Sequence, residues 1–467
     1  MFGKQTYVKR RQELSEKLGE GIILFLGNNE SPMNFADNSY PFRQDSTFLY
    51  YTGINKPSLT LIIDIDEGKE ILCGDNLTMD MIVWMGNQPK LEEYAMQCGI
   101  KDVRPLNELA VYLNNSVKTN RKVHYLPLYR EDAFRQLHDL LGISHEQILS
   151  GYSEELIRVI VAQREIKSDE EILEIEKAVN VSLEMHEAAI KMTKPGMFEA
   201  TIAAEMHKIA LASGGDIAFP IIATINGQTL HNHYHGNTLK EGDLLLLDAG
   251  AQTEMGYCGD LSSTFPVSAQ FTSLQKELYQ ISLDAHEKAV NKLKPNISFK
   301  EVHFEACRVI AEGLKGMGLM KGNIQDALKI GAHALFFPCG TGHMMGLDVH
   351  DMENLGEKWV GYDGKEKSTQ FGLKSLRLGK DLKPGFVLTI EPGIYFIPEL
   401  IDLWYSEKRH SEFLNYDQII RYNNVGGMRN EENFLITDKG ARRLGKLRPK
   451  TINEIEEIRS TVLKLRI

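Results

Sequence analysis

The sequence has few cysteines, and none of them form a close pair. The five cysteines are odd in number, widely spaced and without a CxxC motif: Cys73, Cys98, Cys258, Cys307 and Cys339. This usage argues against a disulfide framework and predicts free thiols in a reducing compartment.

Long apolar runs and an excess of basic residues are also missing. No run is long enough to span a bilayer, and residues 1–14 carry charges but lack the apolar core of a secretion signal. The 53 Lys and Arg residues are outnumbered by 64 Asp and Glu residues, and the net charge is −11. That balance argues against nucleic acid or an anionic membrane as the main partner. We therefore expect a cytoplasmic protein.

The length and composition are ordinary for a globular protein with more than one domain. The chain has 467 residues, of which 42% are hydrophobic and 25% are charged. This is enough for two or three domains with sizeable cores. A polar stretch around residues 150–168 predicts a boundary, with one domain over residues 1–155 and a second over residues 165–467.

The first domain is predicted to be α/β. Its residues 43–53 are rich in aromatic and polar groups without an obvious catalytic set, and we expect a strand and a turn there. The other expected elements are strands at 21–26, 59–65 and 71–73 and a helix at 131–141.

The second region contains a repeated stretch that ends in an acidic residue. Residues 244–247 are four leucines, which predicts a strand buried on both faces, and Asp248 follows them just before a glycine turn. A second copy at residues 382–393 places Glu391 at the position of Asp248, and Asp260 follows the first copy after a hairpin-like return. A carboxylate at the end of a buried strand needs a cation or hydrogen-bond donors. The repetition predicts two facing half-sites around one ion cluster, and favours this over the alternative that the acids are simple turn formers.

Each copy is preceded by two predicted helices. Ser168 fits a capping box that opens the first helix, Pro195 marks its end, and a second helix spans about residues 198–213. Thr272 and Ser298 open an equivalent pair after the first half-site. This internal repeat predicts a sheet made from two related halves, with helices outside and the acidic ends meeting inside.

Five short motifs, in order along the second region, resemble those of one enzyme family. They are DAG at 248–250, GD at 259–260 with a following Thr264, GH at 342–343 with GLDVHD at 346–351, IEPGIY at 390–395, and R-x-E at 429–431. Together they resemble the pita-bread metallopeptidases, which include aminopeptidase P, prolidase and methionine aminopeptidase, over roughly residues 165–445. The resemblance implies an α/β (α+β) fold, with a creatinase-like N-terminal domain and a pita-bread catalytic domain that has an internal twofold repeat.

The resemblance also implies roles for individual residues. The implied metal ligands are Asp248, Asp260, His343, Glu391 and Glu431. The implied residues beside the scissile peptide are His231 and His350, and the implied support around the ligands comes from Tyr395 and Arg429.

This ligand set suits a particular metal chemistry. Four carboxylates and one imidazole form a hard, oxygen-rich site, which favours two divalent ions, and Mn²⁺ over four-coordinate zinc. A hydroxide held between the ions would attack the peptide carbonyl, with Glu391 as proton acceptor and His350 assisting the carbonyl oxygen. Asp248 would lie near the free α-amine of the substrate, which predicts an exopeptidase.

The N-terminal region narrows the choice within the family. Residues 43–53 resemble the N-terminal domain of aminopeptidase P, and residues 398–402 with Arg409 and His410 lie in an insert also seen in that group. We therefore expect an Xaa-Pro aminopeptidase, which acts on peptides with proline in second position. Prolidase, which cuts Xaa-Pro dipeptides, is the alternative. The resemblance also implies a homodimer or a higher homo-oligomer.

Two positions depart from the family's pattern. Cys339 stands where a histidine is common, and Asn430 stands where an aliphatic residue is usual. The first departure leaves open a weakly active or inactive peptide-binding protein. A separate alternative is a zinc site of His231, His233 and His235 on one face of a strand, although only His231 matches a functional position of the family.

Overall fold

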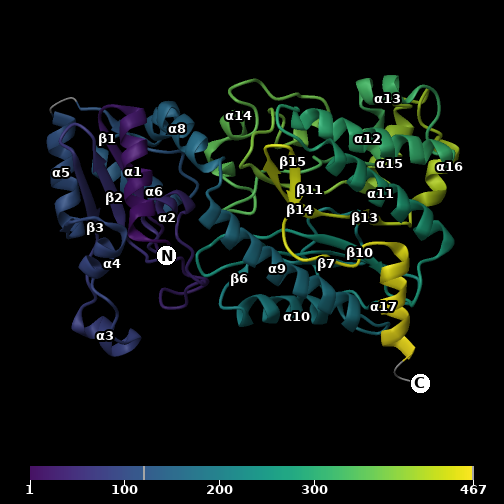
Figure 1. Cartoon of the computed structure of the whole chain (residues 1–467), viewed down its shortest axis with the longest axis horizontal. Coiled ribbons are helices and arrows are strands. Elements are labelled where there is room, and N and C mark those ends of the chain that lie inside the picture. The colour runs from purple at the N-terminus through teal and green to yellow at the C-terminus, as the bar shows by residue number, and fades with distance from the viewer. Residues whose placement is uncertain (119–120, 465–467) are drawn as a thin grey trace. The chain divides into compact units, whose positions relative to one another are not determined.

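The computed structural model describes residues 1–118 and 121–464, and the chain divides into two compact units. Unit 1 comprises Met1–Arg164 and Met352–Trp359, and unit 2 comprises Glu165–Asp351 and Val360–Ile467. Figure 1 shows the helices and strands of each unit. Within the described residues, no helix is both long enough and apolar enough to cross a membrane.

Unit 1 is built around a mixed five-stranded sheet with the strand order β4-β3-β2-β1-β5. The antiparallel neighbours β1 (Ile22–Leu26) and β2 (Thr60–Asp64) are almost entirely buried, because their Ile and Leu side chains alternate toward two covered faces. The three predicted strands and the predicted helix at 131–141 are confirmed. The other elements of this unit are β3 (Lys69–Cys73), β4 (Asp102–Arg104), β5 (Val123–His124), α1 (Lys4–Leu18), α3 (Met79–Met85), α4 (Leu91–Cys98), α5 (Leu106–Lys118), α6 (Glu131–Leu141), α7 (His145–Gly151), α8 (Glu154–Arg164), η2 (Glu353–Leu355) and most of α14 (Glu357–Val360).

The expected strand and turn at residues 43–53 is wrong, because this segment forms the helix α2 (Ser46–Thr52). The carboxylate of Asp45 accepts the backbone N–H of Phe48 at 2.9 Å, and Gly53 closes the helix in the left-handed conformation with φ of 70°. These two end signals outweigh the strand preference of the aromatic and β-branched side chains between them.

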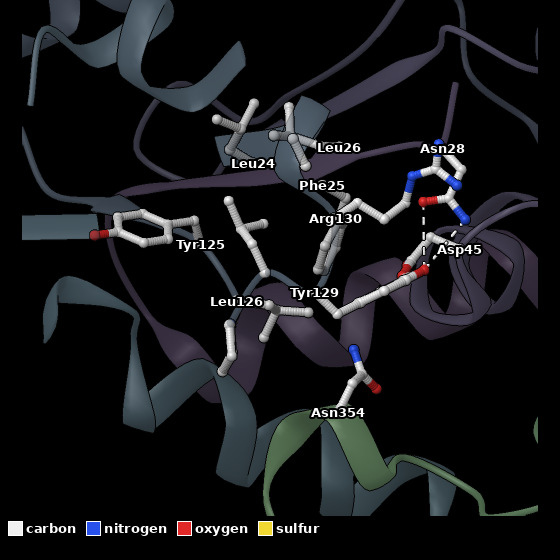
Figure 2. Close-up of a pocket in the computed structure, with 13 residues that line it drawn as sticks. Leu24, Phe25, Leu26, Asn28, Asp45, Tyr125, Leu126, Tyr129, Arg130 and Asn354 are labelled. Atoms are coloured by element: carbon white, nitrogen blue, oxygen red, sulfur yellow. Dashed lines mark hydrogen bonds between the residues drawn. The ribbon is translucent and has the colours of Figure 1, made fainter. Parts of the chain in front are cut away.

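A small cavity of about 40 Å³ lies beside the end of β1 in unit 1 (Figure 2). Its walls are mostly aliphatic and aromatic, and its polar groups bond one another. The Tyr129 hydroxyl donates to Asp45 at 3.2 Å and accepts an amide N–H from Asn28 at 3.1 Å. A cavity of this size holds a water molecule but no peptide.

The four predicted helices of unit 2 are confirmed. α9 (Asp169–Met192) is followed by α10 (Glu199–Ala212), and α11 (Ser273–Lys292) by α12 (Phe299–Gly316). The side chains of Ser168, Thr272 and Ser298 each accept a backbone N–H from the first turn that follows, as their capping patterns predict. In Figure 1 the pair α9–α10 and the pair α11–α12 lie on opposite sides of the strands.

The described strands of unit 2 form two three-stranded sheets and two two-stranded ones, β12-β13 and β6-β9, rather than the single sheet that we expected. Of the three-stranded sheets, one has the order β10-β8-β7, and the other has the order β11-β14-β15. β8 (Leu244–Asp248) is buried along its whole length, as its four leucines predict. It pairs antiparallel with β10 (Ser262–Pro266), so that Ser262 lies opposite Asp248.

The second sheet repeats this arrangement around β11 (Val387–Ile390) and β14 (Glu432–Thr437), which pair antiparallel. Residues 427–437 form two strands, β13 (Gly427–Arg429) and β14, with Asn430 and Glu431 between them. The interruption turns the Glu431 N–H to the carbonyl oxygen of Ser262, at 3.1 Å. The two halves therefore meet at their acidic ends without forming one continuous ladder.

The remaining elements of unit 2 surround this core. They are β6 (Asp216–Ile217), β7 (Ile222–Thr224), β9 (Ala251–Gln252), β12 (Gly393–Tyr395), β15 (Gly440–Arg443), α13 (Ile324–Ile330), η1 (Ala332–Leu335), η3 (Leu373–Ser375), α15 (Pro398–Ser406), α16 (Tyr416–Ile419), η4 (Ile420–Tyr422) and α17 (Ile452–Lys464).

Candidate metal centre

The acidic residues at the ends of the strands line one pocket of about 290 Å³ in unit 2. Asp248 is the last residue of β8, and Asp260 lies two residues before β10. Glu391 follows β11 directly, and Glu431 lies between β13 and β14. The predicted meeting of two half-sites is therefore present in the fold, because antiparallel pairing carries each acid to the same end of its sheet.

The imidazole of His343 lies among these carboxylates at close range. Its Nε2 atom is 3.4 Å from Asp260 Oδ2 and 3.5 Å from Glu391 Oε1. Its Nδ1 atom lies 3.0 Å from the carbonyl oxygen of Met344, which can accept the Nδ1 proton and leave the Nε2 lone pair for an ion. One ligand atom each from Asp260, His343 and Glu431 lie within 4.8 Å of one another.

The carboxylates repel one another and have lost hydration. Burial, followed by the charge of Asp248, raises the pKa of Asp260 well above its usual value. Burial, together with the charges of Asp260, Glu391 and Asp248, likewise raises the pKa of Glu431. Burial raises the pKa of Glu391 to about 7, against the opposing effects of His343 and Arg429. A cation is the group that would reverse all three shifts.

The donor set fits divalent metal ions. Asp248 Oδ1, Asp260 Oδ1 and Glu431 Oε1 are buried and have no hydrogen-bond partner among the residues that the structure describes. Unpartnered carboxylate oxygens at such depth are costly unless an ion coordinates them. Oxygen ligands with one imidazole suit hard or borderline divalent ions.

Arg429, which lies in the second half-site, hydrogen-bonds to residues of the first half-site. Its guanidinium donates to the Ser262 hydroxyl through Nε at 2.9 Å, to the Tyr395 hydroxyl through Nη1 at 2.9 Å, and to Asp248 Oδ2 through Nη2. The Ser262 hydroxyl in turn donates to Glu431 Oε2 at 2.7 Å. These bonds orient Asp248 and Glu431 before any ion binds.

The other histidines with predicted roles differ in how they lie relative to this pocket. His231 and His233 line it, and the rings of His350 and His343 meet edge-on with centroids 4.3 Å apart. The expected strand at residues 231–235 is wrong, because this segment has no strand. His235 instead lies with Nε2 3.0 Å from the Ile221 carbonyl oxygen, so the three histidines do not share a face. The alternative zinc site therefore loses its geometric basis.

The two departures from the family's pattern have different positions. Cys339 lines the pocket, and burial with the nearby Glu391 charge raises the pKa of its thiol to about 12, so the thiol is neutral. Asn430 faces away from the pocket, where it accepts a hydrogen bond from the Tyr279 hydroxyl at 3.0 Å and approaches Ser282 at 3.3 Å. Both partners of Asn430 lie on α11.

Several lining residues were missed by sequence reasoning. Arg377 lies in the pocket wall with Phe219 and Pro220, and Ser262 orders the ligands from behind. They carry no local signal, because each is a single residue outside any repeated motif.

A buried cluster of carboxylates and a histidine, hydrogen-bonded by an arginine, is a candidate centre for metal-assisted hydrolysis. Comparison with known proteins agrees. Residues 174–438 match the model of metallopeptidase family M24, and residues 7–125 match the N-terminal domain of aminopeptidase P. The chain belongs to metallopeptidase family M24 and is a metallopeptidase, that is, a hydrolase.

Individual relatives cover nearly the whole chain. It is 30% identical to Xaa-Pro dipeptidase of Rattus norvegicus, over 96% of this chain and 92% of the relative. It is 29% identical to Xaa-Pro aminopeptidase of Escherichia coli (strain K12), over 85% of this chain and 88% of the relative. A solved structure of zinc-substituted E. coli aminopeptidase P in complex with product has a TM-score of 0.80 and 26% identity, covering 99% of both chains.

Proposed function

We propose that this metallopeptidase removes the N-terminal residue from peptides that have proline in second position. The observation that carries the proposal is the pocket in unit 2, in which the acidic ends of both half-sites converge with His343. Relatives named for Xaa-Pro cleavage, and the match of residues 7–125 to the aminopeptidase P N-terminal domain, support the substrate class.

We assign the metal ligands to Asp248, Asp260, His343, Glu391 and Glu431, which would hold two divalent ions, with Mn²⁺ as the preferred metal. Four oxygen-donor side chains support this preference over a thiolate-bound metal. When bound, such ions polarise a peptide carbonyl and acidify water.

The chain's own residues complete the proposed reaction. Glu391 would hold the proton that water gives up, at a carboxylate oxygen facing His343. His350 and His231 would flank the scissile peptide, and His350 would donate to its carbonyl oxygen. Arg429 and Tyr395 hold Asp248 in place, where its carboxylate would receive the free α-amine of the substrate.

Finer features of the protein belong to the same proposal. Residues 1–155 would form the N-terminal domain and residues 165–467 the catalytic domain. The five free cysteines support a reducing, cytoplasmic compartment. A homodimer or higher homo-oligomer is supported by the exposed apolar side chains of α3, among them Trp84 at 87% exposure.

The second candidate function is that of an Xaa-Pro dipeptidase. Arg377 in the pocket wall favours it, because a guanidinium there could bind the carboxylate of a dipeptide. Under the main proposal the peptide continues past proline, and this carboxylate is absent from the pocket.

The test compares an Xaa-Pro-Xaa tripeptide, its Xaa-Ala-Xaa analogue and the Xaa-Pro dipeptide, each with added Mn²⁺. We expect cleavage of the first tripeptide after its first residue and weak cleavage of the alanine analogue. Proline's tertiary amide has no N–H, so a shaped apolar wall can accept its ring without leaving a donor unpaired. Cleavage of the dipeptide alone, with a KM that rises in Arg377→Met, would replace the aminopeptidase assignment with prolidase. If none of the three peptides is cleaved, the proposal that this chain is an Xaa-Pro peptidase is wrong.

A further inference from the structure

A second cluster of metal-binding side chain types lies in unit 2, apart from the carboxylates. His303 and Cys307 are one helical turn apart on α12, and His333 lies in the short helix η1. All three are buried, with exposures of 0%, 0% and 1%. One ligand atom from each lies within 4.8 Å of the other two.

His333 is the member that ordinary packing leaves unexplained. Neither of its ring nitrogens has a hydrogen-bond partner among the residues that the structure describes. A buried polar group in this state costs about 1–3 kcal/mol. Burial, together with the neighbouring His410, lowers the pKa of His333 to about 4, so the ring is neutral and offers a lone pair.

His303 is oriented as metal-binding histidines are. Its Nδ1 atom lies 2.8 Å from the Thr341 hydroxyl oxygen, and its Nε2 atom lies 3.4 Å from Cys307 Sγ. A hydrogen bond at Nδ1 fixes the ring and leaves Nε2 to coordinate. Around a tetrahedral zinc ion, a nitrogen and a sulfur ligand are about 3.5 Å apart, from Zn–N near 2.0–2.1 Å and Zn–S near 2.3 Å. The observed separation therefore already matches that of two ligands on one ion.

We propose that His303, Cys307 and His333 bind one ion of the zinc class, at a site distinct from the carboxylate centre. Two imidazoles and a thiolate form a soft, nitrogen- and sulfur-donor set, whereas the carboxylate centre is rich in oxygen. Binding converts the Cys307 thiol to a thiolate and releases one proton to solvent. Because the three side chains are buried, the ion enters as unit 2 folds.

Thr341 connects this site to the carboxylate pocket. The Thr341 hydroxyl contacts His303, and the Thr341 carbonyl oxygen accepts the backbone N–H of Glu391 at 2.7 Å. An ion on His303 would thus hold in place the segment that positions Glu391. Burial, followed by the charge of Cys339, raises the pKa of the Cys307 thiol, and Cys339 itself lines the pocket.

Cobalt provides a direct test, because Co²⁺ bound to a thiolate has a near-ultraviolet charge-transfer band that oxygen and nitrogen ligands do not produce. The full chain is produced in cobalt-supplemented medium, and its absorption spectrum and metal content are measured. We expect the band in the wild type and in Asp260→Asn, which disrupts only the carboxylate centre. The band and one equivalent of cobalt should be lost in Cys307→Ser and in His333→Asn.

Two cysteine variants serve as matched controls. Cys73→Ser removes a buried free thiol of unit 1, and Cys339→Ala removes the thiol that faces the pocket. Both should keep the band. Absence of the band in the wild type overturns the proposal whatever the variants do, including any that fail to fold. Its persistence in Cys307→Ser, or its loss in Cys339→Ala alone, would place the thiolate elsewhere and also overturn it.

Discussion

Replacing Asp260 with asparagine removes one negative charge from the carboxylate cluster with little change in side-chain size. With metal present, we expect the loss of most bound metal and nearly all turnover. With metal stripped, the stability should change in the opposite direction. The ionised carboxylates repel one another in a buried site, so the neutral variant should unfold less readily than the stripped wild type.

The pKa of Glu391 sets the size of this effect. It is raised from 4.5 to about 7, so ionising this group in the fold costs about 3 kcal/mol more than in the unfolded chain. Because the folded pKa is raised, the native state binds more protons between these values, and stripped protein should lose stability as the pH rises from 4.5 to 7. Burial is the larger cause and Asp260 a smaller one, so Asp260→Asn should recover about 1 kcal/mol at pH 8. The recovery should be smaller at lower pH, because burial raises the pKa of Asp260 and this carboxylate takes up a proton more readily there.

The assay is scanning calorimetry of chelator-treated protein, with and without added Mn²⁺, at pH 8 and pH 5. One kcal/mol corresponds to about 2–4 °C in Tm for a domain of about 200 residues. At a free Mn²⁺ concentration of 100 times the Kd, the free energy of unfolding of the wild type should rise by about 2.7 kcal/mol. The rise for Asp260→Asn should be far smaller. Asp438→Asn, at an exposed hairpin turn, is the matched control and should behave as wild type. A stripped Asp260→Asn that melts below stripped wild type would refute the reasoning, as would an unchanged metal response.

Three further substitutions test separate parts of unit 2. Cys339→His should raise kcat/KM on an Xaa-Pro tripeptide at saturating Mn²⁺, because a neutral thiol is a weak donor, and a decrease at unchanged metal content would mean a pocket shaped around the thiol. Glu165→Gln should lower the free energy of unfolding by about 3–5 kcal/mol, measured by urea denaturation, because Lys380 is buried against this carboxylate; an effect below 1 kcal/mol would contradict this. Arg429→Lys should lower the free energy of unfolding by about 3 kcal/mol, since an ammonium group cannot reproduce the bonds to both Tyr395 and Asp248. Full metal affinity in this variant would argue against a supporting role of Arg429 at the metal ligands.

Local signals in the sequence determined the elements that carry the site. The leucines before Asp248 produced a buried strand, and the capping residues Ser168, Thr272 and Ser298 each opened a helix. Such signals act over a few residues, so they survive in any tertiary context that buries the same face. The end signals at Asp45 and Gly53 act over the same range and outweigh the aromatic content between them.

Contacts between distant parts of the chain were decided only by the tertiary structure. The sequence placed Arg429 near the ligands through a resemblance alone, whereas the fold shows its guanidinium bonding Ser262, Tyr395 and Asp248 at once. Arg377 in the pocket wall and the contact of His303 with Thr341 have no counterpart in any short motif. The break at Asn430 and Glu431 separates the β12-β13 pair from the sheet β11-β14-β15. These features depend on which side chains packing brings together, and no pattern within a single stretch of chain encodes that.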